Sequence, residues 1–432
     1  MAARRPADQV LREFFRTRRY LGSSDRRFIA EKVFAVLRHH TYLSSLAAVV
    51  MARMPDARMR VPYPSIVLVA LLEAGKNAAG GTEPGLAEDV GGIWRMDVPD
   101  ADCASFLGIA GGVRLPDSLQ RDDEEGLAVR YSLPAFVVRR WLGRYGAEET
   151  KQLCEAMNAP APVSVRVNTL ACTVEQCRAS LAAHGIDAST TRYSPVGLVL
   201  PKRVNVQELP PFRQGWFEMQ DEGSQILSYL PEVRPGMTIV DACAGGGGKT
   251  LHLAALMGNR GRIIAVDISR FRLESLKERA RRGGVTITET VIAHENGLPS
   301  LLRDVKGDVV TVDAPCSGTG TFRRSPWLKL NLEEERVREM SALQLDLLRR
   351  YAPVVAPGGK LFYSTCSLLC EENEEVIRDF LRDNPEFSLL QAGEILRRQG
   401  LTVGQTEGAD LTLLPHRTGT DGFYGAVMVR SA

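Results

Sequence analysis

Two cysteines and an aspartate in the C-terminal half of the chain have the types and spacing that could carry out chemistry. Asp313 and Cys316 open the stretch DAPCSGTGTFRR, which follows an apolar run, and Cys366 lies near the end of a second such run, GKLFYSTCS. Both runs read as buried strands that end in polar loops. In an open α/β sheet the carboxyl ends of the strands form one edge, where ligands bind. We therefore expect an acid and two thiols to meet at this edge.

This set of residues would suit the methylation of cytosine at carbon 5. A thiolate that adds to carbon 6 turns the ring into an enamine, which can attack a sulfonium methyl group. A base must then remove the carbon 5 proton so that the thiol can leave. One cysteine, one carboxyl group and one further proton acceptor form the minimum set, and Cys366, Asp313 and Cys316 could supply it.

A glycine-rich turn precedes these two strands. The segment PGMTIVDACAGGGGKT predicts a strand over Thr238–Asp241, a tight turn over Gly245–Gly248 and a helix from Lys249. Four glycines let backbone N–H groups approach a ligand at a helix N-terminus. The P-loop pattern fails because Cys243 stands where it needs glycine, and the dinucleotide pattern fails at Thr250. The turn is therefore not predicted to bind ATP or NAD.

The acid after this turn favours a nucleoside cofactor without a pyrophosphate. Asp267 ends the next predicted strand, RIIAVDIS, where a carboxylate can accept both ribose hydroxyls. The alternative is that Asp267 only caps the helix that follows. S-adenosylmethionine is the commonest cofactor of this kind, and Asn296, after a third strand VTITETVI, would then lie beside its adenine.

The hydrophobic spacing divides the chain into three regions. From Val10 to about Leu127 it is helical and predicts a bundle of about five or six helices. The strand VSVRVNTL, a helix over Val174–His184 and a strand over Gly197–Leu200 then predict a small α+β module. From about Gln220 strands and helices alternate, which is typical of an α/β domain.

The arginine content points to a nucleic-acid partner. Although the net charge is only +2, nine of the 54 basic residues are lysines and the rest are arginines. Planar guanidinium groups suit phosphates and stacked bases, and the alternative is a solvated arginine-rich face. Arg166 and Asn168 lie on the strand face opposite its valines, where they would either contact a ligand or form local hydrogen bonds.

The cysteine pattern argues against a metal site. The eight cysteines form no C-x-x-C pair and the six histidines are scattered, so no metal is expected. The arginine-rich start lacks the apolar core of a signal peptide, and no apolar run is long enough to span a membrane. We therefore expect a cytoplasmic protein whose thiols remain reduced.

Several motifs resemble, in order and spacing, those of the RsmB/NSUN family of S-adenosylmethionine-dependent RNA cytosine 5-methyltransferases. They are DACAGGGGKT, AVDIS, DAPCSGTGTFRRSPWLK and YSTCSLLCEENEEVI, and the resemblance runs from about Tyr131 to the C-terminus. It includes RVNT, MQDEGSQ and PHRTGTDGFY, and its most specific feature is the cysteine pair, PC in one motif and TC in the next. The helical first region looks like the NusB-like RNA-binding domain of the bacterial 16S ribosomal RNA methyltransferases of this family.

The resemblance implies a fold and a division into domains. Residues 221–432 would form a Rossmann-like methyltransferase domain around a seven-stranded, mostly parallel sheet. Residues 126–220 would form a small α+β module that faces RNA, and residues 1–125 an all-α NusB-like domain.

The resemblance also implies a role for each site residue. Cys366 would be the nucleophile, Cys316 would assist proton removal and product release, and Asp313 would contact the cytosine. Lys249 would contact the cofactor loop or the base. The residues implied to hold S-adenosylmethionine are Cys243, Ala244, Gly245, Gly246, Gly247, Gly248, Lys249, Asp267, Asn296 and Asp313. The sequence departs from the family pattern at two places, and both would affect the affinity for the cofactor. It has AGGGGK where members of the family commonly have AAPGGK, and Asn296 where they commonly have Asp.

We therefore predict a monomeric RNA cytosine 5-methyltransferase that works through a covalent Cys366 adduct. Small-subunit ribosomal RNA is the favoured substrate and transfer RNA the second. The alternatives are a DNA cytosine methyltransferase, which would take its nucleophile from the PC motif, and a non-catalytic ribosome-assembly protein that binds RNA. The target base must leave its stack to reach the thiols, and Arg323 and Arg324 are expected to hold the flanking phosphates.

Overall fold

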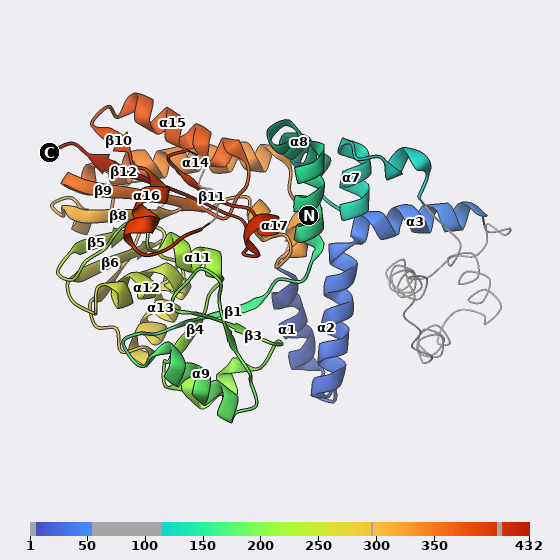
Figure 1. Cartoon of the computed structure of the whole chain (residues 1–432), viewed down its shortest axis with the longest axis horizontal. Coiled ribbons are helices and arrows are strands. Elements are labelled where there is room, and N and C mark those ends of the chain that lie inside the picture. Colours follow the sequence, from blue (N-terminus) through green and yellow to red (C-terminus); the bar gives the residue numbers. More distant parts are fainter. Residues whose placement is uncertain (1–5, 54–114, 295–296, 404–407) are drawn as a thin grey trace. The chain divides into compact units, whose positions relative to one another are not determined.

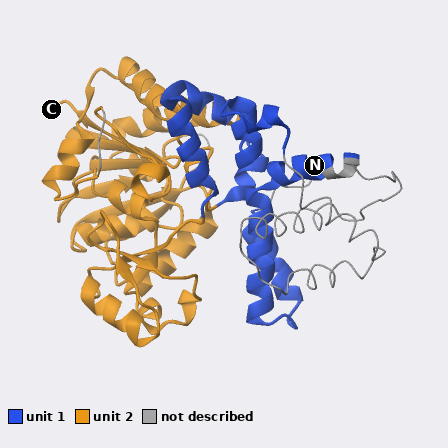
Figure 2. Ribbon diagram, turned by 45° about the vertical axis from the view of Figure 1, so that its right-hand side comes forward, with its two compact units in different colours: residues 1–159, 325–333 blue, residues 160–324, 334–432 orange. Residues whose placement is uncertain are grey.

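The structure is a computed structural model that describes residues 6–53, 115–294, 297–403 and 408–432. Residues 54–114 of the region predicted to be helical, and the adenine contact expected of Asn296, lie outside the described residues. The chain divides into two compact units, residues 1–159 with 325–333 and residues 160–324 with 334–432 (Figure 2). Each unit is described separately below.

The first unit is helical in its described part. Its elements are α1 (Ala7–Thr17), α2 (Ser23–Arg38), α3 (His40–Arg53), η1 (Asp117–Gln120), α7 (Glu124–Tyr131), α8 (Ala135–Asn158) and η5 (Pro326–Leu330). Helix α7 begins where the Asp123 carboxylate accepts a hydrogen bond from Gly126 N at 2.9 Å. Leu127, Val137 and Trp141 are buried between these helices. The helical character predicted for this region is therefore present wherever the structure describes it.

One buried lysine ties residues 325–333 to the helices of this unit. Lys329 Nζ donates hydrogen bonds to the carbonyl oxygens of Arg38 at 3.3 Å and Tyr131 at 3.2 Å, and to Asn158 Oδ1. Burial lowers the pKa of this amine to about 7. Helix α8, which follows the boundary predicted near residue 125, belongs to this unit as well. That domain boundary therefore remains a prediction.

The second unit begins with a small antiparallel sheet of four strands in the order β2-β3-β1-β4. Its elements are β1 (Val163–Val167), α9 (Val174–Ala183), β2 (Ser189–Thr190), β3 (Gly197–Leu200), η2 (Val206–Glu208), α10 (Pro210–Arg213) and β4 (Phe217–Met219). Val165 and Val167 of β1 are buried against α9, as the alternation predicts.

Arg166 and Asn168 are both buried and form local hydrogen bonds. Arg166 Nε donates to Gln220 Oε1 at 2.6 Å. Asn168 Nδ2 donates to the carbonyl oxygens of Gly215 and Gly283, each at 2.9 Å. Of the two alternatives left open by the sequence, these contacts favour the local one.

The rest of the second unit is built on a large mixed sheet in the order β10-β12-β9-β8-β5-β6-β7, with β11 paired to β12 as an eighth strand. Its strands are β5 (Thr238–Asp241), β6 (Arg262–Asp267), β7 (Thr288–Ile292), β8 (Gly307–Asp313), β9 (Val355–Thr365), β10 (Phe387–Leu389), β11 (Leu411–Leu413) and β12 (Phe423–Arg430). Strands β5 to β9 are parallel, whereas β10, β11 and β12 pair antiparallel. The continuous path contains the seven predicted strands.

Helices cover both faces of this sheet (Figure 1). They are α11 (Glu222–Leu227), α12 (Gly248–Leu256), α13 (Arg270–Arg282), α14 (Glu334–Tyr351), α15 (Glu374–Asp383), α16 (Ala392–Arg398) and α17 (Pro415–Thr418), with short turns η3 (Ser300–Leu302), η4 (Thr319–Thr321), η6 (Ala352–Val354) and η7 (Cys370–Glu372). Ile239 and Ile263 pack against α12 and α13, whereas their neighbours Val240 and Ile264 pack against α14. Burial on both faces explains the continuous apolar runs of these strands.

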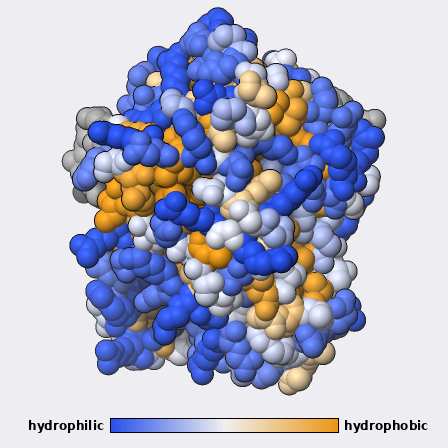
Figure 3. Space-filling model, turned by 90° about the vertical axis from the view of Figure 1, so that its left-hand side faces the viewer, coloured by the Kyte–Doolittle hydropathy of each residue, from blue (hydrophilic) through white to orange (hydrophobic). Residues whose placement is uncertain are grey.

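Apolar side chains are scattered on the exposed surface of the molecule. The face seen in Figure 3 is mostly hydrophilic, with hydrophobic residues in separate patches. Among the helices that the structure describes, none is long and apolar enough to cross a membrane.

Candidate active site

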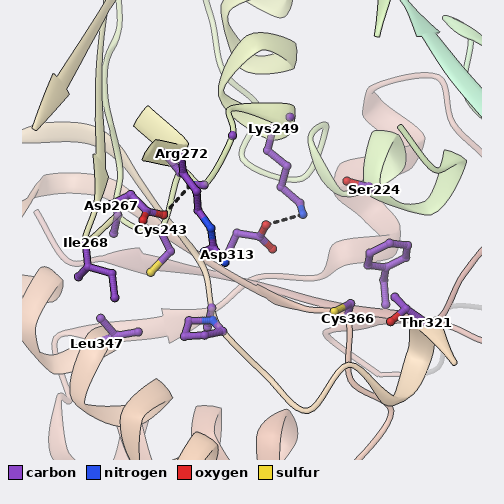
Figure 4. A pocket seen from close by; sticks show the side chains of 18 of the residues that line it. Ser224, Cys243, Lys249, Asp267, Ile268, Arg272, Asp313, Thr321, Leu347 and Cys366 are labelled. Atoms are coloured by element: carbon purple, nitrogen blue, oxygen red, sulfur yellow. Dashed lines mark hydrogen bonds and ion pairs between the residues drawn. The ribbon is translucent and has the colours of Figure 1, made fainter. Parts of the chain in front are cut away.

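A cavity of about 1020 Å³ opens at the carboxyl edge of the large sheet, and all its lining residues belong to the second unit. Figure 4 shows Asp267, Ile268 and Cys243 at one end, and Cys366 and Thr321 at the other. The side chains of Lys249 and Asp313 lie between the two ends. The cavity can therefore hold two ligands that meet at its middle.

The glycine turn forms one wall at the start of α12. Gly247 has φ 84°, and a Cβ on it would meet Leu276 Cγ at 2.6 Å. Gly248, the first residue of α12, lines the cavity and has nothing within 4 Å of an added Cβ. The turn therefore needs glycine for its own conformation at one position and leaves room for a ligand at the next.

Asp267 at the end of β6 faces the same end of the cavity. Its Oδ2 accepts from Gly245 N at 2.9 Å and its Oδ1 accepts from Ser269 N at 2.7 Å. Ser269 is the N-cap of α13, so Asp267 does not cap that helix. Each carboxylate oxygen keeps a further lone pair, which could accept a ribose hydroxyl.

The thiol of Cys243 lines the cavity beside this turn. Burial raises the pKa of Cys243, and the nearby carboxylates of Asp241, Asp313 and Asp267 raise it further. The thiol is therefore held in its neutral form, as a small side chain in the cavity wall rather than as a nucleophile.

An ion pair crosses the middle of the cavity. Lys249 Nζ donates to Asp313 Oδ2 at 2.8 Å, and Ser364 Oγ donates to Asp313 Oδ1 at 2.8 Å. Asp313 ends β8, and Ser364 is its register partner in β9. The Lys249 ammonium also lies over the ring of Phe423, 5.8 Å from its centroid. The carboxylate is thus held in place by one cation and one hydroxyl.

The two predicted thiols lie side by side. Cys316 Sγ and Cys366 Sγ are 3.3 Å apart, and Gly320 N donates to the carbonyl oxygen of Cys366 at 2.9 Å. The parallel pairing of β8 with β9 brings both loops to one edge, as the sequence predicts. Cys366 lines the cavity, and Cys316, which is half-buried, contacts Cys366 through the sulfur.

The pKa of Cys316 is raised in this site. The hydrogen bond with Cys366 and burial raise it well above its ordinary value, and the charge of Glu372 adds to this effect. Either sulfur can be the donor in the hydrogen bond that joins them.

Arg323 does not take the phosphate-binding position expected of it, whereas Arg324 lines the cavity and the expectation for it stays a prediction. Arg323 is buried, with Nε 2.7 Å from Asp421 Oδ1, and Arg324 pairs with Asp421 at 2.6 Å and Asp221 at 2.9 Å. This network joins the motif loop to the segments MQDEGSQ and GTDGFY. We correct the expectation for Arg323 accordingly: its guanidinium group holds the loop from inside, while Arg324 combines its ion pairs with a place in the cavity wall.

The other predicted residues fall around the cavity, and some further ones were missed. Among the residues that were predicted to bind the cofactor and that the structure describes, only Gly247 does not line the cavity. Arg272, Ser364 and Phe423 were not predicted, although Arg272 and Phe423 line the cavity. Ser364 precedes Cys366 by two residues at the end of β9. Because side chains two residues apart in a strand lie on the same face, this spacing was the sequence signal that could have identified Ser364. Within the described ranges, no cluster of His, Cys, Asp and Glu could hold a metal ion.

Comparison with known proteins agrees with this architecture. The family "16S rRNA methyltransferase RsmB/F" matches residues 229–429, and its ferredoxin-like domain matches residues 133–207. A ribosomal RNA small subunit methyltransferase B of Pseudomonas putida is 35% identical over 72% of this chain and 71% of its own length. That of Sodalis glossinidius is 30% identical over 95% of this chain and 91% of its own length.

Solved structures share the fold over most of the chain. A methyltransferase homolog protein from Pyrococcus horikoshii is 28% identical, covers 73% of this chain and 100% of its own, and has a TM-score of 0.61. NSun6 from Pyrococcus horikoshii, 21% identical with a TM-score of 0.61 over 69% of this chain and 98% of its own, shows the fold alone. The extent and identity of these matches show that the chain belongs to the RsmB/F family of 16S rRNA methyltransferases.

Proposed function

We propose that this chain methylates carbon 5 of a cytosine in RNA through a covalent adduct with Cys366. The observation that carries the proposal is the pair of thiols 3.3 Å apart at the end of the cavity. A reaction that first forms and later breaks a sulfur–carbon bond needs a nucleophile and a separate proton acceptor close to it. The Lys249–Asp313 pair lies between Cys366 and the end of the cavity that holds Cys243 and Asp267 (Figure 4).

S-adenosylmethionine is the cofactor, and when bound it supplies the methyl group. The backbone of the glycine turn and the Asp267 carboxylate would hold its nucleoside and amino-acid parts, since both face open space at one end of the cavity. This end of the cavity is lined by Ala244, Gly245, Gly246 and Gly248. Arg272 also lines the cavity and could place a positive charge near the cofactor.

Cys366 would attack carbon 6 of the cytosine from the other end. Lys249 Nζ keeps N–H donors after its bond to Asp313, and these would stabilise the negative charge that develops on the ring as sulfur adds. Asp313 would accept from the exocyclic amino group and so orient carbon 6 towards the thiol. Both side chains are already held in place before the base arrives, which avoids reorganisation during the reaction.

Cys316 would remove the carbon 5 proton after methyl transfer. Its hydrogen bond with Cys366 is the largest of the effects that raise the pKa of Cys316. That effect is lost once Cys366 has become a thioether, so Cys316 could then release its proton to solvent and act as a thiolate base. Removal of the carbon 5 proton would leave that proton on Cys316 and break the sulfur–carbon bond, so that Cys366 leaves as a thiolate ready for the next turnover.

Small-subunit ribosomal RNA is the substrate we propose, because the two relatives described above are named for it. Residues 1–125 and 126–220 would act as RNA-binding parts beside the methyltransferase domain of residues 221–432. A flipped cytosine in exposed RNA could enter the cavity at low cost.

The test is methyl transfer with purified chain and isotope-labelled S-adenosylmethionine. Unmodified small-subunit ribosomal RNA should gain 5-methylcytosine at one position, read by bisulfite sequencing, while transfer RNA gains none. Methylation of transfer RNA alone would overturn the substrate. Tight RNA binding without any methyl transfer would overturn the activity and favour an assembly factor.

A further inference from the structure

A buried carboxylate lies behind the two thiols. Glu372, the last residue of η7, is fully buried, and burial raises its pKa above the ordinary value. In the described part of the chain its side chain has no Lys or Arg partner. Its hydrogen bonds come instead from hydroxyl, amide and backbone groups, and it is not among the residues that line the cavity.

These hydrogen bonds connect the two loops that carry the thiols. Ser317, directly after Cys316, donates its backbone N–H to Glu372 Oε1 at 2.7 Å and its hydroxyl to Glu372 Oε2. Ser367, directly after Cys366, donates its hydroxyl to the same Oε2 at 2.5 Å. One carboxylate therefore binds the residue that follows each cysteine.

Neighbouring contacts hold the carboxylate itself. Gln344 Nε2 of α14 donates to Glu372 Oε1 at 3.2 Å, and the buried Tyr363 hydroxyl donates to the Glu372 carbonyl oxygen at 2.5 Å. Thr319 Oγ1 accepts from Leu368 N at 2.8 Å, which adds a second connection between the two loops. The position of Glu372 is thus fixed from α14 and β9.

A carboxylate matches the donors of this arrangement. Two oxygens accept four hydrogen bonds from three side chains and one backbone N–H, whereas an amide would reverse two of these bonds, because its nitrogen would donate to the hydroxyls of Ser317 and Ser367, which would then need other acceptors. Burying a carboxylate without a cation is costly. The hydrogen bonds offset part of that cost, and what they hold in place is the pair of serines adjacent to the thiols.

We propose that Glu372 is a positioning residue of the methyltransferase site, and that it sets the separation of the two sulfurs by binding Ser317 and Ser367. The kinetic consequences of this proposal rest on the proposed function. The separation of the two sulfurs, in contrast, can be tested without RNA. Loss of Glu372 should misplace Cys316 relative to the adduct, so that proton removal and release slow more than binding.

The kinetic test compares Glu372→Gln with Glu375→Gln, a control in the first turn of α15 outside this network. Glu372→Gln should lower kcat at least about tenfold with KM for RNA within about twofold, and should increase the fraction of enzyme trapped as adduct on ordinary RNA. Glu372→Asp, which keeps the charge, should recover part of kcat. Wild-type kcat and adduct fraction in Glu372→Gln would overturn the proposal.

A second measurement does not depend on RNA. Phenylarsine oxide bridges two adjacent thiols, forming two As–S bonds while the arsenic-bound oxygen leaves as water with the two thiol protons. Its affinity for the Cys316–Cys366 pair should fall at least about tenfold in Glu372→Gln and stay unchanged in Glu375→Gln.

The two measurements separate the possible failures. If no RNA is methylated by the wild type yet the arsenical affinity falls as expected, the proposed function fails and the positioning role stands. If the arsenical affinity is unchanged in Glu372→Gln, the positioning role is wrong. Should Glu372→Gln fail to fold, Ser367→Ala, which removes one of the connections, must show the same loss of arsenical affinity for the proposal to stand.

Discussion

Lys249 Nζ and Asp313 Oδ2 lie 2.8 Å apart at the centre of the cavity, between Asp267 and Cys366. The lysine side chain is 14% exposed and the aspartate side chain 34%, so the pair is partly shielded from water. An ion pair in such a place is stronger than one on the surface, and it keeps both groups in position for a substrate.

Replacement of Lys249 by methionine should therefore impair chemistry more than folding. We expect Lys249→Met to slow single-turnover methyl transfer on the order of 100-fold, because one charged donor to the ring is lost. The control is Lys277→Met, which removes an exposed lysine paired with Glu274 on α13. Transfer by Lys249→Met within about threefold of the wild type would exclude the role we give to this ammonium group.

Adjacent glycines of the turn should respond differently to alanine. Gly247→Ala should lower the free energy of unfolding by about 2 kcal/mol, because its Cβ would collide with Leu276 and φ is positive. Gly248→Ala should leave stability within about 0.5 kcal/mol. Its Cβ projects into the cavity, so its affinity for S-adenosylmethionine should fall at least about tenfold in calorimetric titration. Full cofactor affinity in Gly248→Ala would place the cofactor elsewhere.

Asp241 should make stability depend on pH. It is fully buried at the end of β5, and burial raises its pKa from 3.8 to about 6, although the hydroxyls of Thr250 and Thr311 donate to it at 2.6 and 3.0 Å. Because the folded pKa is raised, the stabilisation from its proton is complete below about pH 3.8 and is lost as pH rises through about 6.

Asp241→Asn should remove that dependence. Relative to the wild type, the free energy of unfolding of the variant should rise between pH 5 and pH 8 by roughly 1.4 kcal/mol, measured by urea denaturation. The exposed Asp187→Asn serves as the control. A difference between Asp241→Asn and wild type that stays constant across this range would refute the assignment.

The buried network around Asp421 predicts a structural defect rather than a binding defect. Arg323→Met should lower the free energy of unfolding by about 3 kcal/mol, because it leaves Asp421 with one fewer cation in a buried site. RNA affinity of the folded variant should stay within about twofold, as it should in the exposed Arg270→Met. A stable Arg323→Met that binds RNA weakly would restore the phosphate role first expected of it.

Much of the central architecture could be predicted because burial alone determines it. The alternating neighbours Ile239 and Val240 pack on opposite faces of a covered parallel sheet, so an apolar run between turn signals was a sufficient indication of a strand. The cysteine loops follow from the same logic, since parallel strands place their carboxyl ends together. The helices of the first unit are described only in part.

What could not be predicted depends on contacts between distant segments. Arg323 pairs with Asp421, which lies on a different loop, and nothing in FRR distinguishes a buried arginine from one that binds phosphate. Glu372 stands in the acidic run EENEE, which resembles the solvated first turn of a helix, yet it is the buried member of that run. Contacts between residues that are far apart in the sequence produce no local pattern of residue types. They therefore cannot be predicted from hydrophobic periodicity.

The most direct test of the mechanism compares Cys366→Ala with Cys316→Ala on RNA that contains 5-fluorocytosine. Fluorine at carbon 5 cannot be removed as a proton, so the adduct formed by the nucleophile persists after methyl transfer and is seen on a denaturing gel. Cys316→Ala should still form this adduct, and Cys366→Ala should form none. An adduct in Cys366→Ala together with its absence in Cys316→Ala would contradict the assignment and make Cys316 the nucleophile.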